Sequence, residues 1–81
     1  MPDYVDLVDI IVRRLVTKPD DVKVAEDRSD SGAILITIRV AQEDIGRVIG
    51  KKCSTINAIR HVAKAASIKS GEKVDVDVEE D

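Results

Sequence analysis

Residues 45–60 read IGRVIGKKCSTINAIR, and this stretch decides the fold. Ile45, Val48 and Ile49 have the spacing of the apolar side of a short helix, and Gly50 follows where such a helix ends. A longer helix is predicted over residues 54–68, where apolar residues recur at helical spacing: Ile56, Ile59, Ala63 and Ala66. Two helices therefore flank a loop at residues 50–53 that contains one glycine, two lysines and one cysteine.

The loop at residues 50–53 has the chemistry of an anion-binding site. The first amides of a helix lack partners within the helix and lie at the positive end of the helix dipole. Gly50 has no side chain to block an approach to those amides, and Lys51 and Lys52 add positive charge beside them. A glycine followed by two lysines also occurs as a plain solvated turn, so the flanking helices are what favour binding of a nucleic-acid backbone.

The charges of the chain are unevenly distributed. The formal net charge is −3, yet residues 45–71 contain no acidic residue and six basic ones: Arg47, Lys51, Lys52, Arg60, Lys64 and Lys69. The other 54 residues carry all 16 acidic residues and seven basic ones. If residues 45–71 fold together, a basic patch lies on an otherwise acidic body, which suits a partner with phosphate groups.

The remaining elements are predicted from the spacing of apolar residues. We expect an amphipathic helix over residues 3–16, a short strand over 22–24, a turn over 26–32, a central strand over 33–41 and a last strand from residue 73. A right-handed crossover makes the last strand parallel to the central one, and the hairpin makes the first antiparallel to it. The predicted fold is α+β in the order αββααβ, with a three-stranded mixed sheet and helices on one face. Residues 1–81 form one domain that ends in a short acidic tail at about 79–81.

Several functions are disfavoured by what the chain lacks. Cys53 and His61 are its one cysteine and one histidine, which excludes an internal disulfide and a four-ligand zinc site and makes a nucleophile and base pair improbable. We predict no enzyme activity, no cofactor and no metal. No apolar run reaches the ~20 residues that cross a membrane, and the start of the chain is acidic where a signal peptide is basic. We therefore expect a cytoplasmic protein with no membrane partner.

The stretch IGRVIGKKCSTINAIR, with the order αββααβ, resembles a KH domain of the type II arrangement. In that arrangement a GxxG loop joins two helices and clamps about four nucleotides of single-stranded RNA or DNA. The resemblance covers essentially the whole chain, which in size and in its IGRVIG entry to the loop is similar to the small stand-alone bacterial KH proteins of the KhpA family. It implies a single-stranded RNA partner, a role as RNA chaperone or post-transcriptional regulator, and a homodimer. It also implies a complex with the larger Jag-type KH protein KhpB, linked to cell-wall homeostasis and cell length.

Residues that match the family's motif are expected to contact RNA. The loop would hold the backbone, and the bases would lie in an apolar groove between the two helices and a neighbouring strand. The full predicted set is Gly46, Arg47, Ile49, Gly50, Lys51, Lys52, Cys53, Ile56 and Arg60, with Arg39 on the strand expected to border the groove. The chain has no Phe or Trp and one Tyr, which argues against RRM and most OB folds because these stack bases on aromatic side chains.

Cys53 departs from the family pattern, which has glycine at this position. Its side chain lies where the backbone is expected to approach a phosphate, and a positive φ there would cost about 1 kcal/mol or more. A tolerated replacement is one explanation. A second is a weakened grip on RNA, which would leave a protein-interaction or dimerisation module, and a third is a reactive thiolate beside Lys51 and Lys52 that gates RNA binding.

Two further hypotheses concern partners. A helix-turn-helix interpretation of residues 44–60, for duplex DNA, is disfavoured because the neighbouring segments are predicted strands. The exposed part of the helix over residues 54–68 carries Ala58, Val62 and Ala65, which are small enough to pack closely against a second copy. We therefore expect any homodimer to use this helix.

Overall fold

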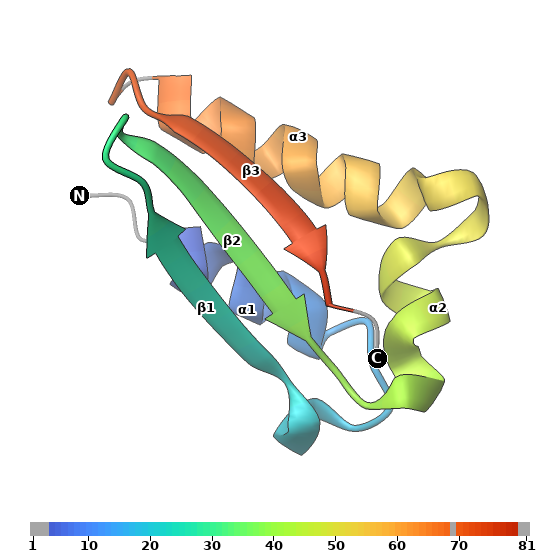
Figure 1. Ribbon diagram of the computed structural model, residues 1–81. Coiled ribbons are helices and arrows are strands. Elements are labelled where there is room, and N and C mark those ends of the chain that lie inside the picture. The colour runs from blue at the N-terminus through green and yellow to red at the C-terminus, as the bar shows by residue number, and fades with distance from the viewer. Residues whose placement is uncertain (1–3, 69, 80–81) are drawn as a thin grey trace.

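Three strands form one sheet, and the two long helices, α1 and α3, lie on a single face of it (Figure 1). The computed structural model describes residues 4–68 and 70–79. Its elements confirm the predicted order αββααβ: α1 (Tyr4–Arg13), β1 (Lys23–Arg28), β2 (Ala33–Arg39), α2 (Ile45–Ile49), α3 (Ser54–Ile68) and β3 (Lys73–Val78). Short 3-10 turns precede β1, α2 and α3.

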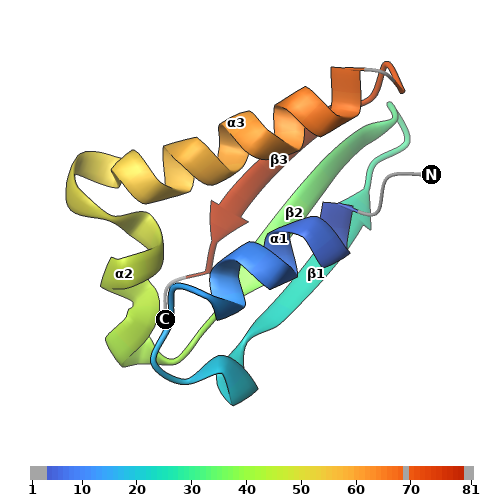
Figure 2. The ribbon, with the colours of Figure 1, turned by 180° about the vertical axis from the view of Figure 1, so that it is seen from behind.

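The strand pairing is the mixed arrangement that the sequence predicts. The strand order is β1-β2-β3, with β1 antiparallel and β3 parallel to β2. Ile36 at the middle of β2 lies opposite Glu26 of β1 and Val76 of β3. Figure 2 shows α1 and α3 across one face of the sheet, while α2 lies beyond the end of the strands. β3 is consequently an edge strand, and α3 packs along it.

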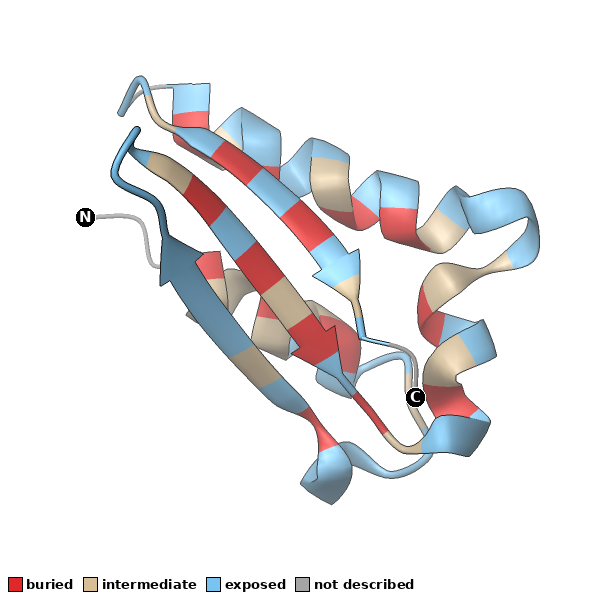
Figure 3. Ribbon diagram, viewed as in Figure 1, coloured by how far each residue is buried: buried red, intermediate tan, exposed pale blue. Residues whose placement is uncertain are grey.

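The core lies between that face of the sheet and the helices. Alternate residues of the central strand are buried, namely Ile34, Ile36 and Ile38, as are Val74 and Val76 of β3 (Figure 3). The helices contribute the rest of the buried face, chiefly Tyr4, Val8 and Val12 of α1 and Ile56, Ile59 and Ala63 of α3. Burying each large aliphatic side chain contributes roughly 1.5–3 kcal/mol, so this layer carries most of the folding energy.

Helix α1 is shorter than the predicted span of residues 3–16, because it ends at Arg13. Leu15 N still donates to Val12 O, at 2.9 Å, in a tighter turn. The amides of Thr17 and Lys18 then donate to the carboxylate of Asp44, at 3.0 and 3.1 Å, instead of to helix carbonyls. A buried acceptor from a distant part of the chain therefore ends the helical hydrogen bonding.

The first strand is longer than predicted, because β1 runs through Arg28 into the expected turn. Pairing with β2 overrides the turn preference of these residues, and Arg28 forms ion pairs with Glu26 and Glu72 at 2.9 and 3.1 Å. The hairpin turn occupies residues 29–32, where Gly32 has φ +88° and its amide donates to Ser29 O at 3.0 Å.

The C-terminal residues of the described chain join the sheet. Glu79 N donates to Ile38 O at 2.9 Å, so the first residue of the predicted acidic tail is attached to β2. The rest of that tail, residues 80–81, and Lys69 of the basic segment lie outside the described residues. Within the described ranges, none of the helices has both the length and the apolar character needed to span a membrane.

Candidate nucleic-acid interface

The loop between α2 and α3 depends on a glycine at its first position. Gly50 ends α2 with φ +75° and ψ +173°, and its amide donates to Gly46 O at 2.8 Å. Only glycine adopts this backbone conformation readily. A Cβ on Gly50 would also lie 2.7 Å from the Cβ and from the backbone N of Thr55 and would overlap its hydroxyl. The first residues of α3 therefore lie directly against Gly50, which brings the chain into α3 by a tight turn.

The next three loop residues are exposed and partly left-handed. Lys51, Lys52 and Cys53 form a 3-10 turn in which Cys53 N donates to Gly50 O at 3.3 Å. Lys52 has φ +56° and Cys53 has φ +62°. The sequence left the φ of Cys53 open, and the structure places it in the region where a non-glycine residue is strained. The two lysine side chains at the tip therefore belong to a loop in which Gly50, Lys52 and Cys53 all have positive φ.

A hollow beside this loop is bounded by α2, α3 and β3. We call it the loop groove; its volume is about 160 Å³ and its lining residues are Ile49, Cys53, Ile56, Arg60, Asp77 and Val78. Four of the predicted RNA-binding residues therefore meet there, from three successive segments of the chain. Ile49, Ile56 and Val78 make part of the lining apolar, and Arg60 and Asp77 add opposite charges to it.

Arg60 joins α3 to the open edge of β3. Its Nε donates to Val76 O at 2.8 Å, and its guanidinium lies 3.6 and 3.9 Å from the carboxylates of Asp75 and Asp77. A second donor of Arg60 binds Asn57 Oδ1 at 3.0 Å. Two carboxylates and a carbonyl therefore lie around this guanidinium and offset part of its positive charge.

Asp77 lines the loop groove and Asp75 lies two residues before it on β3, and neither was identified from the sequence. Asp75 Oδ1 accepts a hydrogen bond from Val76 N and Asp77 Oδ1 accepts one from Val78 N, both at 2.9 Å. Together with Arg60 they satisfy edge groups of β3 that would otherwise face solvent or another strand. The alternation of valine and aspartate in residues 73–78 predicts that the aspartates lie on the solvated face of a strand. It does not predict that this strand is the sheet edge beside α3, because that depends on the strand order.

Asp44 fixes the start of α2, and this residue was also missed. Its side chain is fully buried and accepts hydrogen bonds from Thr17 N, Thr17 Oγ1 and Lys18 N at 3.0, 2.8 and 3.1 Å. The Thr17 amide, helped by the Thr17 hydroxyl, the Lys18 amide and the charge of Arg47, holds the pKa of this carboxyl below its ordinary value. Asp44 thereby attaches the helix that leads into the loop to the segment after α1.

The other predicted RNA-binding residues lie outside the loop groove. Gly46 and Arg47 are exposed on α2, where Arg47 Nε lies 3.7 Å from Asp44 Oδ1. Arg39 lies on β2 and lines a different hollow together with Asp20, Asp21 and Lys23. The strand that borders the loop groove is β3, so the expectation that the strand of Arg39 borders it is wrong. The reason is the sheet order, which makes β3 the edge strand against which α3 packs.

The fold and the site together define a class of protein. A mixed sheet in the order β1-β2-β3, two helices joined by a tight glycine loop, and lysines at the loop tip are the features of a type II KH domain. The model of the family "KhpA/KhpB, KH domain" matches residues 5–78. This chain belongs to the KhpA/KhpB family of KH-domain proteins.

Individual relatives agree with this assignment. The chain is 45% identical over 73 residues to the RNA-binding protein KhpA of Clostridium perfringens, a match that covers 90% of this chain and 96% of that one. It is 38% identical over 73 residues to the RNA-binding protein KhpA of Bacillus subtilis, covering 90% and 89%.

The fold also recurs as part of a larger solved protein. A crystal structure of Aquifex aeolicus Era, with a Y63A substitution and bound to GDP.AlF4-, matches with a TM-score of 0.62 and 19% identity. That match covers 93% of this chain and 29% of the Era chain. At this level of identity the similarity shows a shared fold.

Proposed function

We propose that this chain binds single-stranded RNA, with the RNA backbone on residues 50–53 and bases in the loop groove. The observation that carries the proposal is the conformation of Gly50, which places two exposed lysines and the start of α3 beside an apolar hollow. The names of the KhpA relatives support RNA as the ligand. KH loops of this kind clamp about four nucleotides of backbone.

Eight of the ten predicted residues have a proposed task in this complex. Gly50 lets the backbone approach a phosphate, and Lys51 and Lys52 supply the charge that makes binding salt-dependent. Ile49 and Ile56 contact a base through their apolar side chains. Arg60 also lines the groove, where it holds β3 in place, and Gly46 and Arg47 lie along the approach to the loop.

A wider cellular role follows as part of the same proposal. The family resemblance supports an RNA chaperone or post-transcriptional regulator of the cytoplasm that pairs with a KhpB-type protein and acts on cell-wall homeostasis and cell length. Co-purification of the tagged chain from its own cells tests the pairing. If the tagged chain is recovered without a KhpB-type protein from cells that contain one, the proposed pairing is wrong.

We also propose a homodimer through α3. Ala58, Val62 and Ala65 are exposed on this helix. Next to them is an apolar hollow of about 200 Å³ between α1 and α3, lined by Ile11, Leu15, Thr55, Ala58, Ile59 and Val62. Val62 is 43% exposed and Leu15 36%, so apolar surface is available to a second copy. Sedimentation that shows only monomer at tens of micromolar would contradict the dimer.

The test of RNA binding is the anisotropy of a labelled single-stranded RNA over a salt series. The variant is Lys51→Asp with Lys52→Asp; aspartate tolerates the left-handed backbone of residue 52 better than most residues, so the loop keeps its shape. We expect the variant to bind far more weakly. Losing two phosphate contacts reduces the slope of log affinity against log salt by about 1.4, since each contact on a single strand contributes about 0.7.

The matched control is Arg14→Asp with Lys23→Asp. Both residues are exposed and lie outside the loop groove, and the control changes the net charge by the same amount as the loop variant. RNA binding that falls equally in both variants would show a general charge effect. Absence of binding by the folded wild-type protein would favour the interaction-module alternative, for which the strained Cys53 in the groove is the specific observation.

A further inference from the structure

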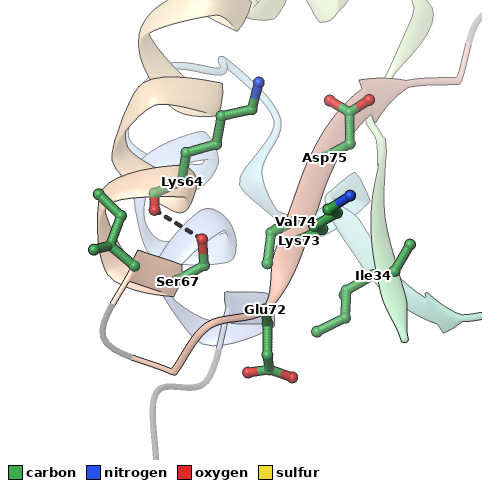
Figure 4. Close-up of a pocket in the computed structure, with 9 residues that line it drawn as sticks. Ile34, Lys64, Ser67, Glu72, Lys73, Val74 and Asp75 are labelled. Carbon is green, nitrogen blue, oxygen red and sulfur yellow. Dashed lines mark hydrogen bonds between the residues drawn. The ribbon is translucent and has the colours of Figure 1, made fainter. Parts of the chain in front are cut away.

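A second, larger hollow lies farther along the same two elements that bound the loop groove. We call it the distal hollow; its volume is about 420 Å³ and it is lined by Ala33, Ile34, Lys64, Ser67, Ile68, Glu72, Lys73, Val74 and Asp75. Figure 4 shows Lys64 and Ser67 on α3 across from Val74 and Asp75 on β3. Ile68 at its rim is 78% exposed, which is unusual for a large aliphatic side chain. The hollow therefore offers apolar contact to a ligand from solvent.

The acidic side chains around the distal hollow have hydrogen-bond or ion-pair partners, and the two lysines differ from them in this respect. Glu72 accepts hydrogen bonds from Tyr4 and Arg28 at 2.9 and 3.1 Å. Asp75 accepts one from Val76 N and lies 3.6 Å from Arg60. Within residues 4–68 and 70–79, by contrast, neither the Lys64 nor the Lys73 ammonium has an acidic partner. The unneutralised charge at the hollow is thus positive, one lysine from each bank.

The distal hollow lies farther along α3 and β3 than the loop groove, on the other side of Arg60. Both lie between α3 and β3, and Arg60, which reaches Val76 O and Asp75, separates them. Ile56 of α3 lines the first and Lys64 of α3 the second, and these residues are about 12 Å apart along the helix at ~1.5 Å per residue. An RNA strand that leaves the loop groove along β3 therefore reaches the distal hollow without crossing the body of the protein.

We propose that the distal hollow is a second nucleotide-binding site, which takes the RNA strand that runs on from the loop groove. Lys64 and Lys73 contact phosphates on either bank, and a base lies against Ile68 and Val74. The inference rests on the proposed RNA binding and extends its footprint beyond the four nucleotides that a KH loop clamps. The chemistry that favours RNA is the pairing of unneutralised lysines with apolar surface, along the same two elements that bound the loop groove.

The test compares a labelled uridine tetranucleotide with a labelled uridine decanucleotide, each by anisotropy over a salt series. For the wild type we expect the decanucleotide slope to be steeper by about 1.4, which corresponds to two added phosphate contacts on a single strand. Lys64→Glu with Lys73→Glu should abolish this difference and leave tetranucleotide binding unchanged. Ile68→Ser should weaken binding of the decanucleotide alone, with no change in slope.

The matched control is Arg14→Glu with Lys23→Glu, which makes the same charge change away from both hollows. Equal slopes for the two oligonucleotides with wild-type protein would overturn the second site and leave the loop groove intact. An equal loss of affinity for both oligonucleotides in the lysine variant would also overturn the second site, since the lysines would then act only through their general electrostatic field. Failure of the folded wild type to bind either RNA would overturn the proposed function itself.

Discussion

Cys53 has a left-handed backbone, with φ +62°, and its side chain lines the loop groove. A left-handed conformation costs a residue with a Cβ about 1–2 kcal/mol, and glycine loses part of that advantage through its freer unfolded chain. We expect Cys53→Gly to raise the free energy of unfolding by about 0.5–1 kcal/mol. Urea denaturation measures this change, and RNA anisotropy on the same protein shows whether the side chain also obstructs the groove.

Cys53→Ala is the control that separates the sulfur from the backbone. Alanine keeps the Cβ and therefore the strain, so its stability should stay close to that of the wild type. If Cys53→Ala and Cys53→Gly stabilise the protein equally, the thiol and not the backbone conformation is the source of the effect. If neither changes stability, the loop relaxes at no cost and the strain argument is wrong.

The edge of β3 receives a hydrogen bond from another element, because Arg60 of α3 donates to Val76 O. Arg60→Met keeps the aliphatic stem and removes the donor to Val76 O and the charge near Asp75 and Asp77. We expect a loss of about 1 kcal/mol in the free energy of unfolding, the usual net value of one such hydrogen bond. The salt slope for RNA should change by less than the ~0.7 of one phosphate contact, because the guanidinium is already partly offset. Urea denaturation and anisotropy measure the two effects separately.

Arg14→Met is the matched control for Arg60→Met, since it removes an exposed guanidinium from the turn after α1. Its stability should stay within a few tenths of a kcal/mol of the wild type, as is usual for surface substitutions. A slope reduced by a full contact in Arg60→Met, with stability unchanged, would show that Arg60 leaves the strand edge to bind phosphate.

The elements that depend on local patterns were predictable from the sequence. Apolar spacing gave the helices and strands, and the β-branched residues of residues 33–41 gave the central strand, which the strand order confirms. The boundaries that failed depend on distant partners. α1 ends early because Asp44 takes the amides of Thr17 and Lys18, and β1 extends because it pairs with β2 as far as Arg28.

The candidate site divides in the same way. Gly50 and the two lysines were identified from adjacent residues, because a helix end and a turn are local features. The contributions of Asp75 and Asp77 required knowing that β3 is the edge strand beside α3. The prediction that the strand of Arg39 borders the groove was wrong because the strand order was not known. The spacing of apolar residues identifies the two faces of a strand but not its neighbours in the sheet.

At the scale of the whole molecule, two carboxylates join segments far apart in the sequence. Asp44 connects α2 to the segment after α1, and Glu72, before β3, accepts a hydrogen bond from Tyr4 in α1 and forms an ion pair with Arg28 in β1. The hydroxyl of Tyr4, with Ser70 and Arg28, holds the pKa of Glu72 below its ordinary value, as the Thr17 amide does for Asp44. Both acids are therefore stabilised in their charged form by the folded state.

This linkage predicts how stability depends on pH. For a group with a depressed folded pKa, the contribution is fully present above the unfolded pKa, near 4 for these acids, and is lost as the pH falls through the lower folded value. We expect the urea midpoint to be nearly constant from pH 7 to about 5 and to fall below about pH 4. Asp44→Asn should be less stable than wild type at pH 7, and the difference should shrink as acid protonates Asp44 in the wild type.

Asp20→Asn, which removes an exposed carboxylate, should follow the wild-type curve. A difference between Asp44→Asn and wild type that is the same at pH 3 and pH 7 would mean that Asp44 acts through packing and not through its charge.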